Sequence, residues 1–365
     1  MTSRIMAARS AFPAHRYPQN ELARAFAAVA DAAGGLRPRQ RALLDRLFAN
    51  ADVATRHTVL PIGEYLASSD LPAPGVMPVN DRYIEEATAL GERALRSALD
   101  GSGLTAGDLN LLIVTSVTGV AVPSLDARLI PRLGLRPDIK RLPVFGLGCV
   151  AGAAGLARLH DYLLAWPGHR AALLAVELCS LTLPRTKVTM ADLVASALFG
   201  DGAAAVVATG EDFAAPTGAA RLPQVIATRS EVYPDSTDTL GWRLADGGFR
   251  IVLTADLAEV VERRLNGSVS AFLGEHGLTV DDIGSWICHP GGPKVLDAAQ
   301  RALKLPDSAM TASRRSLSEA GNMSSVSVLH ILELTAAEEA PPPGSFGLMI
   351  GLGPGVSAEL LLLRW

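Results

Sequence analysis

Apolar residues along the chain follow two patterns: short continuous runs bounded by glycine, proline or polar residues, and longer stretches with helical spacing. The first pattern predicts β-strands at 111–115, 171–176, 203–208, 224–228, 285–288, 346–350 and 357–363. The second predicts helices at 21–33, 38–50, 82–99, 150–164, 193–199, 255–273, 292–303 and 326–337. Because strands and helices alternate, we expect an α/β protein whose sheets are covered by helices and buried on both faces.

The pattern also repeats. Two similar segments, Gly-Leu-Thr-Ala-Gly-Asp-Leu and Gly-Leu-Thr-Val-Asp-Asp-Ile, begin at Gly103 and Gly277, 174 positions apart, and each leads into an apolar run. The same offset carries Cys149 to position 323, beside Asn322 and just before another helix-like run. We therefore expect two similar halves, residues 1–215 and 216–365, that meet in a Gly-, Pro- and Ala-rich stretch at 210–223. The Cys149 turn of one half should face the Asn322 turn of the other.

Composition narrows the class of protein. The chain has 365 residues, 49% of them hydrophobic and 19% charged, which is typical of a globular protein with two domains or subdomains. A net charge of −4 with scattered Lys and Arg gives no reason to expect a nucleic-acid partner. Three cysteines without short spacing argue against a disulfide framework and a zinc site, and fit a cytoplasmic protein. No signal-peptide segment and no membrane span are expected.

One cysteine lies where a nucleophilic thiol is expected. Cys149 lies in Gly-Leu-Gly-Cys-Val-Ala-Gly-Ala-Ala-Gly, a glycine-bounded turn that opens a predicted helix. Unpaired N–H groups and the positive end of the helix dipole both favour thiolate. Downstream, Cys-His-Pro-Gly-Gly and Gly-Asn-Met-Ser-Ser contribute His289 and Asn322. A Cys, a His and an Asn in this order suggest a thiol nucleophile with an imidazole and an amide partner.

Structural interpretations of the same residues stay open at this point. A cysteine in an Ala- and Gly-rich stretch is commonly a small buried residue, and for Cys179 and Cys288 we expect burial alone. His289 by itself is typical of a structural histidine. Asn322 could cap a helix N-terminus, with or without a second role.

Five motifs together resemble the type III polyketide synthases, the chalcone-synthase-like branch of the thiolase superfamily. They are the Cys149 turn, Ala-Leu-Phe-Gly-Asp-Gly-Ala-Ala-Ala at 197–205, His-Pro-Gly-Gly at 289–292, Gly-Asn-Met-Ser-Ser at 321–325 and Gly-Leu-Gly-Pro-Gly at 351–355. The resemblance runs from about Arg16 to the C-terminus. It implies a thiolase-like fold of duplicated βαβαβ halves in a five-layered α/β/α/β/α core, and a homodimer. It also implies condensation of malonyl-CoA with an acyl-CoA starter and cyclisation of the product, with CoA thioesters as substrates and no metal or cofactor.

The resemblance assigns roles to single residues. Cys149 would carry the starter acyl group as a thioester, and His289 would pair with its thiolate. His289 and Asn322 would donate hydrogen bonds to the enolate formed when malonyl-CoA loses CO2. Phe199 would shield this step from water at the junction of tunnel and cavity.

Further residues are expected to contact substrate or the second subunit. Val122 matches a residue that reaches the partner's cavity, and Arg46 matches one that contacts CoA phosphates, although Leu43 and Asn50 stand where family members often have Lys. Trp242 lies in a segment that contributes cavity wall, with a purely structural role as the alternative. The expected substrate-binding set is Phe199, Trp242, Thr118, Val122, Ser324 and Arg46.

Three functions are compatible with these motifs. The first is a type III polyketide synthase. The second is a condensing enzyme like ketoacyl synthase III, which takes malonyl from acyl carrier protein. The third is a catalytically inactive thiolase-fold scaffold. For the first function, an aliphatic composition with only 5% aromatic residues favours a fatty acyl starter and alkylpyrone or alkylresorcinol products.

Overall fold

The structure is a computed structural model that describes residues 2–32, 35–67, 76–183, 188–213, 222–245, 248–254, 256–338 and 340–365. The strands of its first half are β1 (Ser3–Ala11), β4 (Leu111–Thr115), β5 (Lys140–Val144), β6 (Arg170–Leu178) and β7 (Asp201–Gly210). Those of its second half are β8 (Gln224–Val232), β11 (Ile283–Cys288), β12 (Phe346–Gly353) and β13 (Ser357–Arg364). The strand order is β11-β12-β13-β8-β1-β7-β6-β4-β5.

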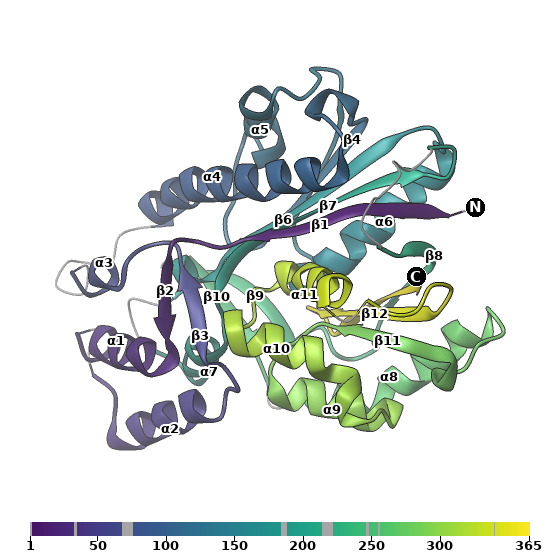
Figure 1. Cartoon of the computed structure of the whole chain (residues 1–365). Coiled ribbons are helices and arrows are strands. Elements are labelled where there is room, and N and C mark those ends of the chain that lie inside the picture. The colour runs from purple at the N-terminus through teal and green to yellow at the C-terminus, as the bar shows by residue number, and fades with distance from the viewer. Residues whose placement is uncertain are drawn as a thin grey trace.

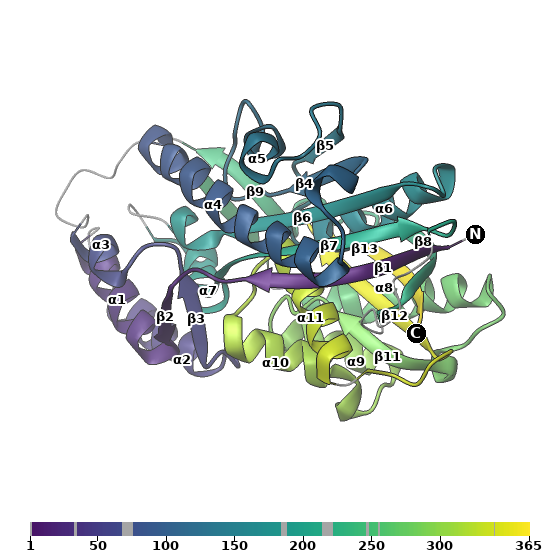
Figure 2. The ribbon, with the colours of Figure 1, turned by 45° about the horizontal axis from the view of Figure 1, so that its top comes forward.

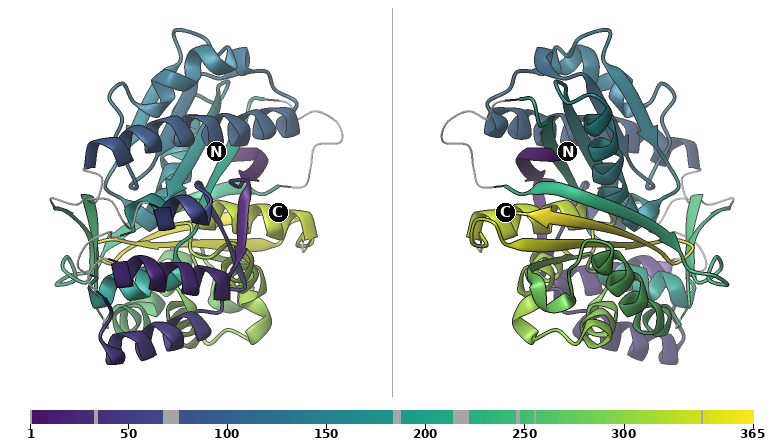
Figure 3. Two further views of the ribbon diagram at one scale, coloured as in Figure 1. Left: turned by 90° about the vertical axis from the view of Figure 1, so that its left-hand side faces the viewer. Right: turned by 90° about the vertical axis from the view of Figure 1, so that its right-hand side faces the viewer.

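Helices and strands form five layers (Figures 1 and 3). The long helix α4 (Val76–Ser102) and α5 (Leu125–Leu133) cover the first group of strands on the outside. The helices α6 (Ala151–Ala165) and α11 (Ser325–Glu338) lie between the two groups, and both are buried along most of their length. The outer layer on the other side contains α8 (Leu257–Gly274), α9 (Pro293–Leu303) and α10 (Thr311–Ala320). The expected α/β architecture is therefore confirmed.

The sequence repeat is visible in the structure. In each half a short helical turn precedes a strand, and the aspartate of the turn accepts hydrogen bonds of 2.7–2.8 Å from the backbone N–H and the hydroxyl of a threonine: Asp108 from Thr105 and Asp282 from Thr279. The helices α6 and α11 begin at Ala151 and Ser325, again 174 positions apart. The duplicated halves thus place the two turns at the N-termini of two helices that pack together in the central layer.

A glycine permits this close packing. A Cβ atom on Gly152, in the first turn of α6, would collide with the carbonyl oxygen of Ser325 at the start of α11. Only a residue without a side chain lets the two helix ends approach so closely. The Cys149 turn and the Asn322 turn are therefore held together by backbone contact.

The sequence pattern did not reveal several elements. These are β1, β5, α5, α10, the antiparallel pair β2 (His15–Pro18) and β3 (Thr55–Thr58), the helix α3 (Ile62–Ala67) and the hairpin β9 (Leu240–Ala245) with β10 (Gly248–Leu253). The expected sheets were separate, whereas β1 and β8 pair at two positions and join all nine strands. Residues 33 and 255, at the ends of two expected helices, and 214–221, around the expected boundary between the halves, lie outside the described residues. The division into 1–215 and 216–365 stays a prediction.

The N-terminal segment forms an extension at one end of the molecule. Figure 2 shows α1 (Gln19–Ala32), α2 (Pro38–Ala49), β2, β3 and α3 together at the left end, beside α7 (Met190–Leu198). The helices α1 and α2 both contact α7, which leads directly into Phe199. The extension thus packs against the element that carries one wall of the site described next.

Candidate active site

Cys149 lies in the tight helical turn Gly148–Val150, directly before α6. Gly148 adopts the left-handed conformation, with a φ of 53°, and a Cβ atom there would approach the ring of Pro354 to 2.5 Å. The Gly-Leu-Gly-Pro-Gly segment at 351–355 therefore packs against the back of the nucleophile turn. The Cys149 side chain is 9% exposed, more than those of Cys179 (3%) and Cys288 (0%).

His289 follows β11, the strand at one edge of the sheet, and its backbone N–H donates a 2.9 Å hydrogen bond to the Ile350 carbonyl of β12. The side chain is buried, at 1% exposure. Neither ring nitrogen has a hydrogen-bond partner among the described residues. A buried imidazole without a protein partner is available to a reacting group.

Asn322 is fixed from both ends. Its backbone N–H donates to the Leu198 carbonyl at 2.8 Å, and its amide oxygen accepts a hydrogen bond of 2.8 Å from the backbone N–H of Ser324. Because the amide oxygen is already hydrogen-bonded, the amide nitrogen is the atom that can donate to the thiol. This hydrogen bond lowers the pKa of Cys149 in part. The side chain therefore stabilises the turn before α11 and also presents a donor to the site.

These three side chains line one small cavity of about 30 Å³. Cys149 comes from the first half of the chain, and His289 and Asn322 come from the second. The rest of the lining is almost wholly apolar: Leu198, Phe199, Leu240, Ile251, Leu253, Leu257, Gly291, Val295, Leu352, Gly353 and Val356. The arrangement joins a thiol, an imidazole and an amide in a space that excludes most water.

Burial of the thiol opposes the thiolate state that the sequence predicts for Cys149. Burial raises the pKa of the Cys149 thiol to about 12, while the Ser324 hydroxyl lowers it in part and the Glu177 carboxylate raises it further. Burial lowers the pKa of the His289 imidazole to about 3. Loss of water around both groups therefore opposes the helix end that favours thiolate. In the site without substrate, burial favours a neutral thiol and a neutral imidazole.

This charge state predicts how the thiol reacts with pH. The alkylation rate of Cys149 by iodoacetamide should rise about tenfold per pH unit between pH 7 and 9, because the thiolate fraction rises in that way below the thiol pKa. Cys149 should still react faster than Cys179 and Cys288, which are less exposed. Peptide mapping after timed labelling measures all three rates. A Cys149 rate that is already constant above pH 6 would indicate a thiolate–imidazolium pair instead.

Phe199 lies at the end of α7 and lines the cavity beside Cys149. Its carbonyl accepts a 2.7 Å hydrogen bond from Nη1 of Arg56, whose Nε donates to Gln19 at 3.0 Å. Arg56 is a buried cation at 4% exposure, and burial lowers its pKa to about 10. The sequence analysis did not predict a role for it, because a single Arg in a polar segment is typical of a surface residue.

Trp242 lies on β9, in the β9–β10 hairpin. It pairs directly with Ile251, and both Ile251 and Leu240, two residues before Trp242 on the same strand, line the cavity. Residues directly opposite, and residues two apart on one strand, share a face. Trp242 itself is half-buried and is not part of the cavity lining; it lies closer to the turn of the hairpin than Leu240 does, and its role as cavity wall stays a prediction.

The other expected contact residues lie outside this cavity lining. Ser324 is buried next to the Cys149 thiol, and Thr118 donates a 3.0 Å hydrogen bond to the carboxylate of Glu177. Val122 is 89% exposed, and Arg46 is exposed on α2. Their roles stay predictions.

Glu177 was missed by the sequence analysis. One of its oxygens accepts hydrogen bonds from the Ser116 and Thr118 hydroxyls and the Val117 N–H, and the other accepts one from the Ser325 hydroxyl at 2.6 Å. Burial raises the pKa of this carboxyl group. The only signal in the sequence is a charged residue in the otherwise apolar run at 171–178.

The described ranges contain neither a cluster of metal-ligating side chains nor a membrane-spanning helix. No group of three or more His, Cys, Asp or Glu side chains in this part of the chain could hold a metal ion. Within it, the helices all fall short of the length and apolarity that crossing a membrane requires.

Comparisons with known proteins agree with this geometry. Residues 2–212 match the family model for the N-terminal domain of chalcone and stilbene synthases, and residues 224–365 match the model for the C-terminal domain. The chain is 52% identical over 361 residues to a 1,3,6,8-tetrahydroxynaphthalene synthase of Streptomyces peucetius subsp. caesius, which covers 99% of this chain and 93% of the relative. It is 33% identical over 331 residues to a phloroglucinol synthase of Pseudomonas fluorescens, with 89% of each chain covered.

A solved structure is similar over the whole chain. The crystal structure of 1,3,6,8-tetrahydroxynaphthalene synthase from Streptomyces coelicolor, a bacterial type III polyketide synthase, superposes with a TM-score of 0.89 at 31% identity, and the match covers 99% of both chains.

Proposed function

This chain belongs to the chalcone and stilbene synthase family, the type III polyketide synthases, and we propose that it forms 1,3,6,8-tetrahydroxynaphthalene from malonyl-CoA alone. Membership makes it an acyltransferase that performs decarboxylative condensation and uses malonyl-CoA. Family membership also argues against the two alternative functions, a condensing enzyme that takes malonyl from acyl carrier protein and a catalytically inactive scaffold. The thiolase-like fold is likewise that of the family.

The observation that carries the proposal is the 52% identity to a tetrahydroxynaphthalene synthase over nearly the whole chain. The product named for that relative has ten carbons and oxygens on alternate positions. Five malonyl units contain fifteen acyl carbons and lose five as CO2, which leaves these ten. The composition had favoured a fatty acyl starter, but the named relative makes an aromatic product without an alkyl chain.

The loading step follows from the neutral pair in the cavity. As the Cys149 sulfur attacks the thioester carbonyl of malonyl-CoA, its proton passes to the neutral His289 imidazole, which has no competing hydrogen bond among the described residues. The bond from the carbonyl carbon to the CoA sulfur breaks, and CoA leaves as a thiol with the proton returned from His289. The starter remains on Cys149 as a thioester.

The extension step uses His289 again, now together with Asn322. The next malonyl-CoA loses CO2, and the electron pair of the broken C–C bond becomes an enolate whose oxygen accepts hydrogen bonds from Asn322 and His289. The apolar lining favours this step because the carboxylate loses its charge as CO2 departs. The enolate carbon then attacks the thioester carbonyl on Cys149, and the bond from that carbon to the Cys149 sulfur breaks. The sulfur takes up a proton, and the lengthened chain is left as a CoA thioester that can load Cys149 again.

Product analysis tests the proposal. Purified enzyme with malonyl-CoA as sole substrate should release CoA and give a C10H8O4 product in mass spectrometry. The same enzyme with octanoyl-CoA and malonyl-CoA should give little alkylpyrone. Alkylated products that exceed the C10H8O4 product in this competition would contradict a malonyl starter.

Cavity shape should respond to Trp242. We expect Trp242→Gly to enlarge the cavity beside Ile251, because the indole is the largest group on this face of the hairpin. The product profile should then shift toward bulkier starters or more extensions. Starter-panel assays read by mass spectrometry measure the shift. Alkylation of Cys149 should stay unchanged in this variant, and an unaltered product profile would place Trp242 outside the functional cavity.

A homodimer is also proposed, because an apolar patch surrounds the edge strand β5. The patch comprises the exposed residues Val120, Val122, Leu142, Phe145 and Leu147. The strand β5 is the end of the sheet, and the loop that carries Val122 starts beside it, where the Ser116 N–H donates to the Val144 carbonyl. An exposed edge strand with an apolar patch is typical of a protein interface.

Light scattering at micromolar concentration should therefore give the mass of a dimer with two-fold symmetry. The double variant Leu142→Glu, Phe145→Glu should shift the protein toward monomer, because it places charges in an apolar contact. Val232→Glu, at an exposed apolar position elsewhere, is the matched control. A monomeric wild-type protein would refute the assembly.

A further inference from the structure

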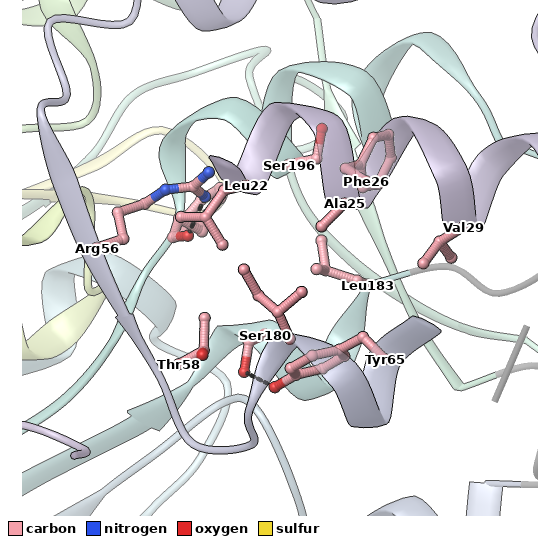
Figure 4. Close-up of a pocket in the computed structure, with 12 residues that line it drawn as sticks. Leu22, Ala25, Phe26, Val29, Arg56, Thr58, Tyr65, Ser180, Leu183 and Ser196 are labelled. Carbon is pink, nitrogen blue, oxygen red and sulfur yellow. Dashed lines mark hydrogen bonds between the residues drawn. The ribbon is translucent and has the colours of Figure 1, made fainter. Parts of the chain in front are cut away.

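Arg56 is a buried cation of the N-terminal extension that none of the steps above uses. Figure 4 shows its guanidinium beside Leu22 of α1, and a dashed line marks the 2.7 Å hydrogen bond from Nη1 to the Phe199 carbonyl. Its Nε donates to the Gln19 side chain at 3.0 Å, and the Gln19 amide nitrogen donates in turn to the Ala197 carbonyl at 2.7 Å. Arg56 and Gln19 therefore hold the C-terminal end of α7, where a cation also interacts favourably with the helix dipole.

The charge of Arg56 is balanced inside the protein by Asp201. Burial lowers the pKa of Arg56 to about 10, and the Asp201 carboxylate raises it in part. Burial raises the pKa of Asp201 to about 6, so both groups are charged above neutral pH. Asp201 is itself fixed by hydrogen bonds of 2.7 Å from the backbone N–H groups of Val59 and Ser180. Because the guanidinium already has its counter-charge, its role lies in the groups that it holds.

The methylene chain of Arg56 packs against two glycines that lie far apart in the sequence. A Cβ atom on Gly321 would lie 2.8 Å from Cδ and 2.9 Å from Cγ of Arg56, and one on Gly200 would lie 3.6 Å from its Cβ. Gly321, with a φ of 71°, directly precedes Asn322, and Gly200 directly follows Phe199. The side chain of Arg56 thus contacts the backbone next to both of these site residues.

Phe199 and Asn322 are joined to each other through the backbone. The Asn322 N–H donates to the Leu198 carbonyl at 2.8 Å, and the Gly200 N–H donates to the Asn322 carbonyl at 3.0 Å, so that Phe199 and Asn322 form a parallel β-bridge. The Phe199 carbonyl takes no part in this bridge, and it is the carbonyl that Arg56 binds. Arg56 therefore restrains the segment that joins the aromatic wall of the cavity to the amide donor.

The strand β3, which carries Arg56, is anchored to α10, the helix that leads into the Gly-Asn turn. The Ala54 N–H donates to the Ser318 carbonyl at 2.8 Å, and the Thr55 hydroxyl donates to the Glu319 carbonyl at 2.8 Å. Both carbonyls belong to the last turn of α10. Arg56 thus extends from a backbone whose position is fixed relative to the turn that it contacts.

We propose that Arg56 is a positioning residue for decarboxylation, which holds the Phe199 ring and the Asn322 amide in place around the malonyl group. None of the contacts described above involves Cys149 or His289, the two groups that carry out loading. A change at Arg56 should therefore slow decarboxylation more than loading, and it should admit water to the enolate. An enolate carbon that takes up a proton from water gives acetyl-CoA in place of a new C–C bond. The proposal rests on the two-donor mechanism above and not on which product forms.

Two variants of the whole enzyme test this role with malonyl-CoA as substrate. Arg56→Met should release labelled CO2 at least about tenfold more slowly than wild type, whereas loading of Cys149, followed by mass spectrometry of the intact protein, should stay within about threefold. Acetyl-CoA formed per CO2 released should rise at least about threefold. Arg56→Lys should recover part of both changes, because an ammonium group can still donate to the Phe199 carbonyl.

The matched control is Arg16→Met, on the neighbouring strand β2, where Arg16 is exposed and donates to the Thr55 hydroxyl. It should keep the wild-type ratio of CO2 release to loading. Partial unfolding lowers both rates by one factor and leaves acetyl-CoA per CO2 unchanged, so that result for Arg56→Met, or wild-type values, would overturn the proposal. If circular dichroism shows Arg56→Met unfolded, Gln19→Leu removes the acceptor of Nε, and an unchanged acetyl-CoA ratio there would overturn it equally. A wild-type enzyme without the C10H8O4 product would refute the proposed product alone, since both ratios remain measurable.

Discussion

Replacing Cys149 by alanine is expected to abolish condensation, with a loss of at least about 10³-fold in CoA release coupled to product. The thioester that carries the growing chain cannot form without the sulfur, and no other cysteine lines the described cavity. Stability should change little, because alanine fits the same small space at the start of α6. Product formation and CoA release, measured with malonyl-CoA, test the prediction.

The matched control is Cys179→Ala. Cys179 is also buried and belongs to the same residue type, but it lies in the turn after β6 and outside the cavity lining. Its replacement should leave condensation within a few-fold of wild type. If the two variants lost activity equally, or if Cys149→Ala still formed product, the assignment of the nucleophile would be wrong.

The meeting of the three site residues could be predicted from the repeat in the sequence. An offset of 174 relates Gly103 to Gly277 and places Cys149 against Asn322, and the structure places the two turns at equivalent helix ends that touch at Gly152. The repeat carries this information because each half folds by the same local pattern, so equivalent turns lie near the pseudo-symmetry axis. His289 follows from the same logic, since β11 is the counterpart of β4.

The thiol's charge state could not be predicted in this way. A glycine turn at a helix N-terminus favours thiolate in water, but the pKa of Cys149 depends on how completely both halves cover it. That cover is built from residues far away in sequence, among them Leu198 and Leu352. The same holds for Arg56, whose burial depends on packing against α1 and Phe199.

Edge positions explain some of the elements that the sequence pattern missed. The strand β5 carries Lys140, Arg141 and Pro143 and lies at the exposed end of the sheet, so it lacks the continuous apolar run of a central strand. The hairpin β9–β10 covers a cavity and is not part of the main sheet, and its alternation of polar and apolar residues is short. Pattern reasoning found strands that are apolar and buried along their whole length, as in β4 and β7. It missed β1, which lies in the middle of the sheet but carries Arg4 and Arg9.

Replacing Asn322 by alanine is expected to slow malonyl-CoA decarboxylation about 10²–10³-fold, because one of the two hydrogen-bond donors to the enolate oxygen is lost. Loading of Cys149 should be affected much less, since that step depends on the thiol and on His289. Release of labelled CO2 from malonyl-CoA measures decarboxylation, and mass spectrometry of the intact protein measures loading. Equal loss in both steps would point to a disrupted site.

The variant Asn322→Asp separates the chemical role from the structural one. Aspartate keeps the oxygen that accepts the Ser324 N–H and so retains the turn before α11, but when ionised it has no N–H to donate. We expect this variant to melt near the wild-type temperature and to decarboxylate as slowly as Asn322→Ala, because a carboxylate beside the enolate adds repulsion to the missing donor. Wild-type decarboxylation by Asn322→Asp at neutral pH would show that the amide only shapes the turn, and the two-donor mechanism would have to be abandoned.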